Sequence, residues 1–136
     1  MPVNASALDQ GGQTGLAQMV LTIRSASGNR HFTVEVAQSP EEQAEGLMFR
    51  RSLAPDRAMI FPFDPAQPVS FWMKDTYTPL DLVFIGADRR IGRIAENCAP
   101  LSLDLIYSGE PVVAVLEIAG GRAAELGLKP GDQVDY

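Results

Sequence analysis

The sequence has few of the residues on which common catalytic and binding sites depend. It contains one cysteine, Cys98, and one histidine, His31. A single cysteine excludes a disulfide within the chain, and a single histidine excludes a His-rich metal site. No apolar run approaches the roughly 20 residues that a membrane-spanning helix needs. Basic residues are also scarce: 11 Lys and Arg face 17 Asp and Glu, which gives a formal net charge of -6.

These shortages exclude several classes of partner. An acidic chain is repelled by nucleic acid and by anionic membrane surfaces. A nucleophilic triad needs a histidine, and His31 opens an alternating strand pattern with no matching motif around it. We therefore expect no metal, no cofactor, no nucleic-acid partner and no direct membrane insertion.

The composition that is present is typical of one compact domain. Of the 136 residues, 46% are hydrophobic and 21% are charged, and a domain of this size buries roughly two-thirds of its unfolded surface. Residues 1–18 are rich in Ala, Ser, Gln and Gly without a periodic apolar pattern, so we expect a mobile N-terminal tail there. Residues 19–136 are predicted to form a single β-rich domain.

Short apolar runs separated by glycine and proline predict many strands. Two β-branched runs, 19–24 and 31–37, flank a Ser-Gly-Asn turn and predict a hairpin. Further strands are predicted at 58–61, 69–73, 82–85, 91–95, 112–118 and 133–136. The predicted fold class is mainly β (α+β): a curled or barrel-like sheet, antiparallel or mixed, with two short helices.

The two helices are predicted from their end signals. Ser39 can cap a helix whose third residue, Glu42, completes a capping box, and Gly46 lies near the end of this helix. The second helix is predicted over 121–126, followed by Gly127 as a left-handed end.

The most informative stretch lies between residues 69 and 81. Side chains alternate along a strand, so Trp72 and Lys74 share the face opposite the predicted core face. Asp75 and Thr76 are good turn formers, and Asp81 follows at the start of the next strand. We therefore expect Lys74, Asp75 and Asp81 to gather near one strand end.

Two interpretations of this stretch stay open. In the structural one, the tryptophan covers the sheet and a Lys–Asp ion pair holds a turn. In the functional one, Trp72 offers the flat apolar wall of a pocket and Lys74 contacts an anion.

Glu117 interrupts a run over 112–119 that is apolar on both faces, as central strands are. A carboxylate there is costly unless it is paired, and the candidate partners are Lys74 and an arginine such as Arg50. A buried ion pair is one interpretation. The other is a carboxyl group whose pKa is raised by burial and which acts as a general base.

Several motifs, in this order, resemble the bacterial and archaeal family known as domain of unknown function 192. The matching motifs are Glu45-Gly46-Leu47-Met48-Phe49-Arg50, Ala58-Met59-Ile60-Phe61, Phe71-Trp72-Met73-Lys74-Asp75-Thr76, Pro79-Leu80-Asp81, Glu117 to Gly120, and Gly131-Asp132. Asp75 stands where the family usually has Asn, and Arg89 where its hairpin commonly has Gly. The resemblance implies a small, mostly β domain without an established activity. Many members carry an export signal or a lipoprotein anchor, so we expect an extracytoplasmic (periplasmic) location, with the signal outside this sequence; a cytoplasmic location is the alternative that stays open.

Three hypotheses for function follow. The first is a non-enzymatic cell-envelope domain that binds a small molecule or peptide through Trp72, Lys74, Asp75, Thr76, Asp81, Glu117 and Arg50. The second is a metal-independent hydrolase or lyase, with Glu117 or Asp81 as general base and Lys74 as electrostatic stabiliser. The third is a structural or interaction module without a ligand.

Overall fold

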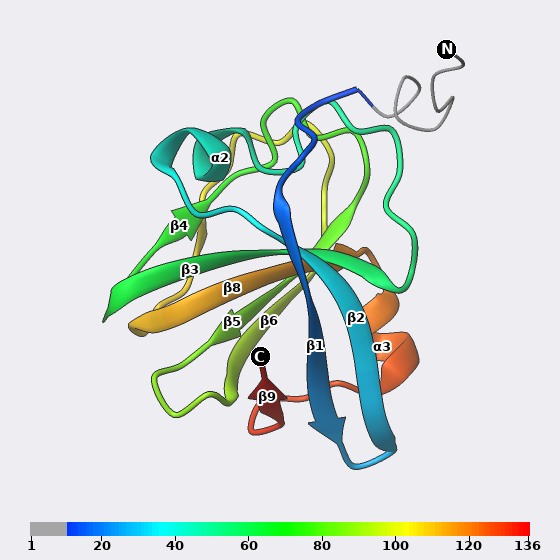
Figure 1. Cartoon of the computed structure of the whole chain (residues 1–136), viewed down its shortest axis with the longest axis vertical. Helices are drawn as coiled ribbons and strands as arrows, with labels where there is room; N and C mark the ends of the chain where they lie inside the picture. The colour runs from blue at the N-terminus through cyan, green and yellow to red at the C-terminus, as the bar shows by residue number, and fades with distance from the viewer. Residues whose placement is uncertain (1–10) are drawn as a thin grey trace.

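The computed structural model describes residues 11–136, which form nine strands and two short helices (Figure 1). In chain order the elements are β1 (Ala17–Ser25), β2 (Gly28–Val36), α2 (Pro40–Glu45), β3 (Arg57–Gln67), β4 (Ser70–Phe71), β5 (Leu80–Ile85), β6 (Ile91–Cys98), β7 (Ile106–Tyr107), β8 (Val112–Ala119), α3 (Arg122–Leu126) and β9 (Gln133–Asp135). No helix within these residues is long and apolar enough to cross a membrane.

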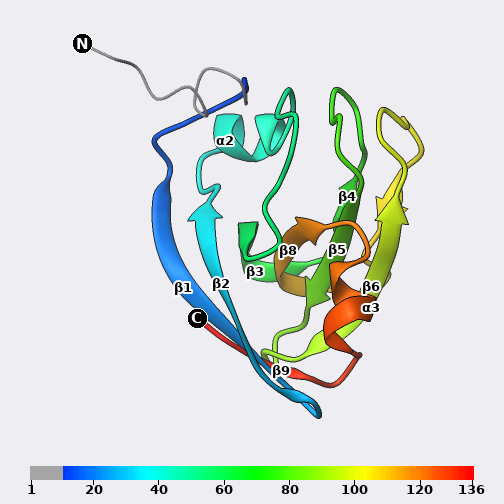
Figure 2. The ribbon, with the colours of Figure 1, turned by 90° about the vertical axis from the view of Figure 1, so that its right-hand side faces the viewer.

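Seven strands form one strongly curled sheet in the order β6-β5-β8-β3-β2-β1-β9. Its pairings are antiparallel except between β2 and β3, which run parallel. Figure 2 shows β1 and β2 on one side and β5 and β6 on the other, with α2 above and β9 below. A bridge between Arg90 and Gln133 joins β9 to the chain just before β6, which draws the two edges together at this end. The predicted fold class, a mainly β mixed sheet curled like a barrel with two short helices, is confirmed.

The first hairpin and the ends of both helices form as the sequence predicts. The first two strands form the expected hairpin, with Leu21 opposite Phe32. The side chain of Ser39 accepts from the N–H of Glu42, whose carboxylate in turn accepts from the N–H of Ser39, so the capping box is complete. Gly127 ends α3 at φ 69°, a left-handed conformation that glycine adopts without strain.

Strand β3 runs to Gln67, well beyond the predicted end at residue 61, and two other strands also differ from the prediction. The strand predicted at 69–73 is shorter, because only Ser70–Phe71 pairs, and it pairs with β7, which the sequence pattern did not predict. The alternation of faces holds nevertheless: Met73 is buried, while Trp72 is 43% exposed.

The domain also begins earlier than residue 19. Leu16 is buried, β1 starts at Ala17, and the side-chain amide of Gln13 donates to the carbonyls of Glu42 and Gly46. Residues 1–10 of the predicted tail lie outside the described residues.

The core has two parts because side chains of the central strands alternate between the two faces of the sheet. Ala114, Leu116 and Ile118 of β8 point into the first part, which lies among β1, β2, β5 and α3. Val115 points into the second part, with Met59, Phe61, Leu80, Leu82 and Phe84. Glu117 shares the face of Val115, so its carboxyl group projects toward this second part.

Candidate functional site

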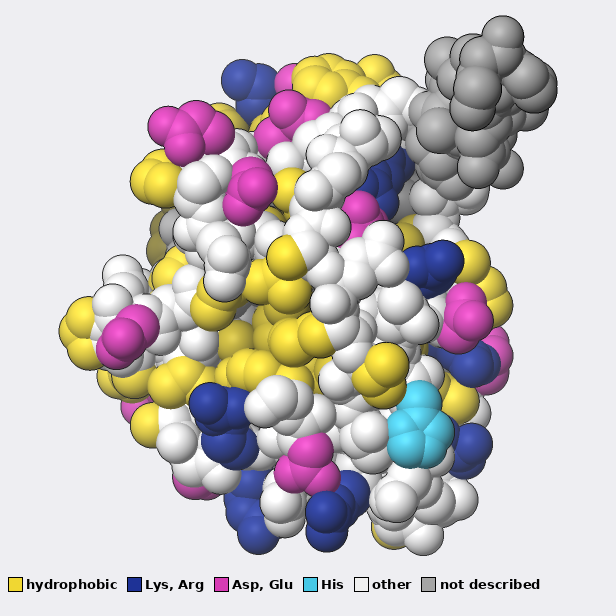
Figure 3. All heavy atoms as spheres, viewed as in Figure 1, with side chains coloured by type: hydrophobic (Ala, Val, Ile, Leu, Met, Phe, Trp, Pro, Cys, Tyr) yellow, Lys and Arg dark blue, Asp and Glu magenta, His cyan; other side chains and the backbone are white. Residues whose placement is uncertain are grey.

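A pocket of about 510 Å³ opens between α2 with its following loop and the strands β3 and β4. The residues around it are Pro40, Gln43, Ala44, Glu45, Gly46, Leu47, Met48, Phe61, Phe63, Val69, Ser70, Phe71, Trp72, Thr76 and Glu117. Figure 3 shows hydrophobic side chains gathered in a recess below α2, with acidic side chains over the helix itself. Pockets that hold small molecules are typically apolar recesses of roughly 300–1,000 Å³ with a few polar groups. This pocket has that character.

Four aromatic rings line the pocket. The rings of Phe61 and Phe71 meet edge to face with centroids 5.0 Å apart, and those of Phe63 and Phe71 do so at 6.4 Å. Trp72 lines the same pocket, and 43% of the residue is exposed. Edge-to-face packing holds rings in defined positions, so the aromatic wall is preorganised.

Gly46 shapes the pocket where α2 ends. Its backbone has φ 51° and ψ -128°, and its N–H donates to the carbonyl of Glu42. A Cβ atom at this position would lie 3.2 Å from Cζ of Phe61. Any other residue would therefore strain the backbone and press on the aromatic wall.

Glu117 is the buried acidic residue of this pocket. It lies on β8 between Met59 of β3 and Leu82 of β5, and only 5% of the residue is exposed. Within the described residues, no hydrogen bond or ion pair reaches its carboxyl group. Burial raises the pKa of Glu117 from 4.5 to about 8, because the charged form loses its hydration without a compensating partner. The carboxyl group is therefore protonated at neutral pH.

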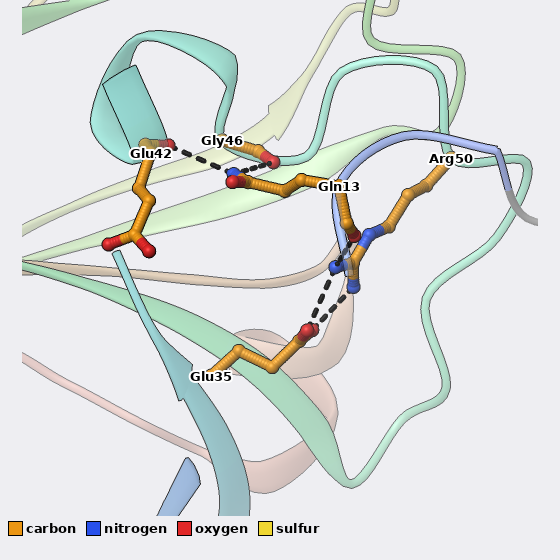
Figure 4. A network of polar contacts seen from close by, with 5 residues as sticks. All are labelled: Gln13, Glu35, Glu42, Gly46 and Arg50. Atoms are coloured by element: carbon orange, nitrogen blue, oxygen red, sulfur yellow. Dashed lines mark hydrogen bonds and ion pairs between the residues drawn. The ribbon is translucent and has the colours of Figure 1, made fainter. Parts of the chain in front are cut away.

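The ion pairs predicted for Glu117 are wrong. Arg50 instead binds both carboxylate oxygens of Glu35 on β2, with one Nη–Oε distance of 2.8 Å, and also donates to the carbonyl of Gln13 at 2.7 Å (Figure 4). The amide of Gln13 in turn holds the carbonyls of Glu42 and Gly46. Arg50 therefore supports the N-terminal segment and the end of α2 from outside the pocket.

Lys74 is exposed and does not line the pocket. Its Nζ lies 5.3 Å from the centroid of the Trp72 ring. Asp75, which also lies outside the pocket, has φ 54°, and its carbonyl accepts from the N–H of Phe49 at 2.7 Å. Aspartate and asparagine tolerate this left-handed conformation better than other residues with side chains, which accounts for either residue at this position.

Thr76 does line the pocket and is 5% exposed. Its hydroxyl donates to the carbonyl of Lys74 at 3.1 Å. Because that bond uses the only hydroxyl proton, the oxygen can face a ligand only as an acceptor.

The prediction that Asp81 lies together with Lys74 near one strand end is wrong. Asp81 is fully buried, and its carboxylate accepts from the backbone N–H groups of Asn97, Gly121 and Ala123 at 2.8, 3.0 and 2.8 Å. These three bonds tie the end of β6 and the start of α3 to β5. The site therefore unites Trp72, Thr76 and Glu117 of the predicted residues, while Lys74, Asp75, Asp81 and Arg50 lie elsewhere.

Sequence reasoning missed most of the pocket wall. Phe61, Phe63 and Phe71 carry the apolar pattern of ordinary core residues, and nothing in that pattern separates a pocket wall from a core. The available signal was Glu117, whose position within an apolar strand marks the place where a core is interrupted.

Comparisons with known proteins agree with this fold. A family model named DUF192 and described as an uncharacterized ACR matches residues 21–136. A crystal structure from Novosphingobium aromaticivorans, of a protein of unknown function, is 40% identical, with a TM-score of 0.89, covering 100% of this chain and 99% of that one. One from Sinorhizobium meliloti, described provisionally as a transcription regulator, is 43% identical, with a TM-score of 0.87, covering 91% of this chain and 97% of that one. No curated protein matches the chain.

Proposed function

The chain belongs to the uncharacterised DUF192 family, and we propose that it is a non-enzymatic domain that binds a small molecule in the pocket between α2 and β3. The pocket is large enough for a compact ligand, and its aromatic wall supplies apolar contact area. As the family resemblance implies, we place this binding domain in the cell envelope.

One observation carries the proposal, namely the unpartnered carboxyl group of Glu117. Its oxygens are not among the fully enclosed unpartnered atoms of the described residues, so they reach the pocket, and a carboxyl group there without a protein partner costs up to about 1–3 kcal/mol. A leucine or methionine at this position would avoid that cost and would fill the recess. A ligand that hydrogen-bonds to Glu117 would explain why a carboxyl group stands at this position, because the ligand supplies the missing partner.

The hydrolase or lyase alternative is less well supported. It required Glu117 or Asp81 as a general base and Lys74 as the stabilising charge. The Asp81 carboxylate already accepts three backbone N–H bonds, and Lys74 does not line the pocket. The alternative of a structural module leaves Glu117 unexplained.

DNA binding, which the description of the Sinorhizobium meliloti protein would suggest, is not favoured for this chain. Binding to DNA draws most of its free energy from basic side chains on phosphates, and the net charge here is -6.

The test is a fragment screen monitored by ¹H–¹⁵N NMR of the labelled chain. A ligand in the pocket should shift the amide signals of Gly46 and Thr76 and the indole N–H signal of Trp72, while signals from β9 stay in place. Native mass spectrometry of the protein purified gently from its source should in parallel show an added mass that disappears on denaturation.

Two matched variants locate the binding. Ala44 is exposed on α2 and lines the pocket, whereas Ala124 is exposed on α3 outside it. Ala44→Trp should therefore abolish binding, and Ala124→Trp should leave it unchanged. Equal behaviour of the two variants, or no fragment that shifts the pocket signals, would overturn the proposal.

A further inference from the structure

Building on the proposed function, we propose that the ligand of this pocket is a cation, specifically a primary ammonium group carried on a compact apolar or aromatic body. The chemistry of the groups around the pocket leads to this class of ligand. It also implies that binding releases a proton from Glu117.

Two neutral polar side chains of the wall, those of Gln43 and Thr76, present acceptors, while the exposed Ser70 hydroxyl can donate or accept. The amide NH₂ of Gln43 donates to the carbonyls of Ala37 and Pro62 at 3.0 and 2.9 Å, so only its Oε1 remains unused. The hydroxyl of Thr76 has likewise given its proton to the carbonyl of Lys74. The Gln43 Oε1 and the Thr76 hydroxyl oxygen can therefore each accept a hydrogen bond from a ligand.

The ionisable side chains that line the pocket are two carboxyl groups, Glu117 inside and Glu45 on α2. No lysine, arginine or histidine is among the described residues of the lining. The nearby Arg50 is held by Glu35, and the net charge of the whole chain is -6. An anionic ligand would meet no positive group in this pocket, whereas a cation would meet two acids.

The aromatic wall suits a cation as well. The face of an aromatic ring attracts a cation through the ring quadrupole, and most strongly so for tryptophan. The Trp72 ring already has an ammonium nitrogen, Nζ of Lys74, at 5.3 Å from its centroid, so its attraction for a cation is already used within the chain. Phe61, Phe63 and Phe71 offer further rings around the same space.

A primary ammonium fits better than a quaternary one. Glu117 has no hydrogen-bond donor near it, and a quaternary ammonium has none to give. A primary ammonium carries three N–H donors, which match the acceptors of Gln43 and Thr76 and the Glu117 carboxylate that forms when the carboxyl proton leaves.

Binding of a cation must change the protonation of Glu117. The free pocket holds this carboxyl group protonated at neutral pH, because burial raises its pKa to about 8. An adjacent ammonium favours the carboxylate, so the carboxyl proton leaves to solvent as the cation enters. Two other titratable groups bear on this site. Glu45 on α2 lines the same pocket. The Cys98 thiol on β6 interacts with Glu117, and its pKa is raised by burial and then by Asp81 and Glu117. The facing residues of β3 and β5, Met59 and Leu82, do not titrate.

The experiment compares benzylammonium with benzyl alcohol, two probes of nearly equal size and shape. Calorimetric titration in two buffers of different ionisation enthalpy measures the protons released on binding. We expect benzylammonium to bind at least about tenfold more tightly, since charge-assisted hydrogen bonds are about twice as strong as neutral ones. Its affinity should rise about tenfold per pH unit until about pH 8 and then level off, with close to one proton released near pH 6.

Two variants assign the proton. Glu117→Gln should abolish the proton release and the preference for the cation, while benzyl alcohol still binds. Glu41→Gln, on the same helix but outside the pocket lining, is the matched control and should keep both the affinity and the proton release. The pH series on the unaltered chain tests the same point without any substitution.

The outcomes separate this inference from the proposed function. If benzyl alcohol binds, is blocked by Ala44→Trp, and matches or exceeds benzylammonium, the pocket binds ligands and the cation inference is wrong. Absence of proton release, or its persistence in Glu117→Gln, overturns the inference equally. If neither probe shifts the pocket signals at millimolar concentration, the inference falls together with the proposed function.

Discussion

Replacing Glu117 with glutamine should change how the stability of the domain depends on pH. The pKa of Glu117 rises from 4.5 in the unfolded chain to about 8 in the folded one. Below about pH 4.5 the carboxyl group is protonated in both states, and it contributes no pH-dependent loss of stability. Between about pH 4.5 and about pH 8, the unfolded chain loses the Glu117 proton while the folded chain keeps it. The free energy of unfolding therefore falls as the pH rises.

The magnitude follows from the size of the pKa shift. One pKa unit is worth about 1.4 kcal/mol, so the unaltered chain should lose on the order of 5 kcal/mol between about pH 4.5 and about pH 8 through this group. Above about pH 8 both states are charged, and the loss stops growing. Glu117→Gln carries no titrating proton, so it should escape this loss and become the more stable protein toward pH 8.

Urea unfolding of both proteins at a series of pH values measures the effect. With an m-value of roughly 2 kcal/mol per M, the difference between the two midpoints should change by about 2.5 M across this range. The difference also removes the contribution of other carboxyl groups. Glu42, whose pKa is lowered chiefly by the N–H of Ser39, and Asp135, whose pKa is lowered chiefly by Gln133, titrate in both proteins.

A difference that stays constant from about pH 5 to about pH 8 would refute the reasoning, because it would mean that folding does not hold the proton on Glu117. ¹³C NMR of the side-chain carboxyl signals gives a direct check: the Glu117 signal should titrate with a midpoint near pH 8.

Three further substitutions test other parts of the structure by urea unfolding. Asp81→Asn should lower the free energy of unfolding by about 2–4 kcal/mol, because one amide oxygen replaces a carboxylate that accepts three backbone N–H groups. Lys74→Ala should change it by less than about 1 kcal/mol, since its contact is an exposed one with Trp72. Arg89→Gly should raise it by roughly 0.5–1 kcal/mol: φ is 61° at this position, and the relief of strain exceeds the lost exposed contact with Tyr136.

Each expectation has a result that would contradict it. A loss under about 0.5 kcal/mol in Asp81→Asn would mean that the three bonds do not anchor α3. A loss above about 3 kcal/mol in Lys74→Ala would indicate that Lys74 forms a buried ion pair, contrary to its exposed position in the structure. A lower stability in Arg89→Gly would show that the contact with Tyr136 outweighs the backbone strain.

Much of the fold was predictable because its signals are local. The Ser39–Glu42 capping box, the Gly127 helix end and the turn of the first hairpin each depend on residues within a few positions of one another. Alternation along the strand at 69–73 correctly separated Met73 from Trp72. The motifs around Trp72 led to the family that the comparison over residues 21–136 shows.

The charge partners were beyond prediction because they come from distant parts of the chain. Arg50 finds Glu35 rather than Glu117, and Asp81 finds backbone groups of β6 and α3 rather than Lys74. A sequence states which charges exist, but the distance between two charges depends on how strands order within the sheet. The parallel pairing of β2 with β3 is an example, since all the other neighbours in this sheet are antiparallel.

The sequence by itself determined that an acidic residue interrupts a buried strand and that Trp72 faces away from the core. Only the tertiary structure decided that Glu117 has no partner and that Phe61, Phe63 and Phe71 enclose the space in front of it. The physical reason is that hydrophobic residues follow the same pattern in a filled core and in a pocket wall. Whether hydrophobic residues form a filled core or a pocket wall depends on whether another element fills the space beside them. In this domain α2 lies at the edge of that space without filling it.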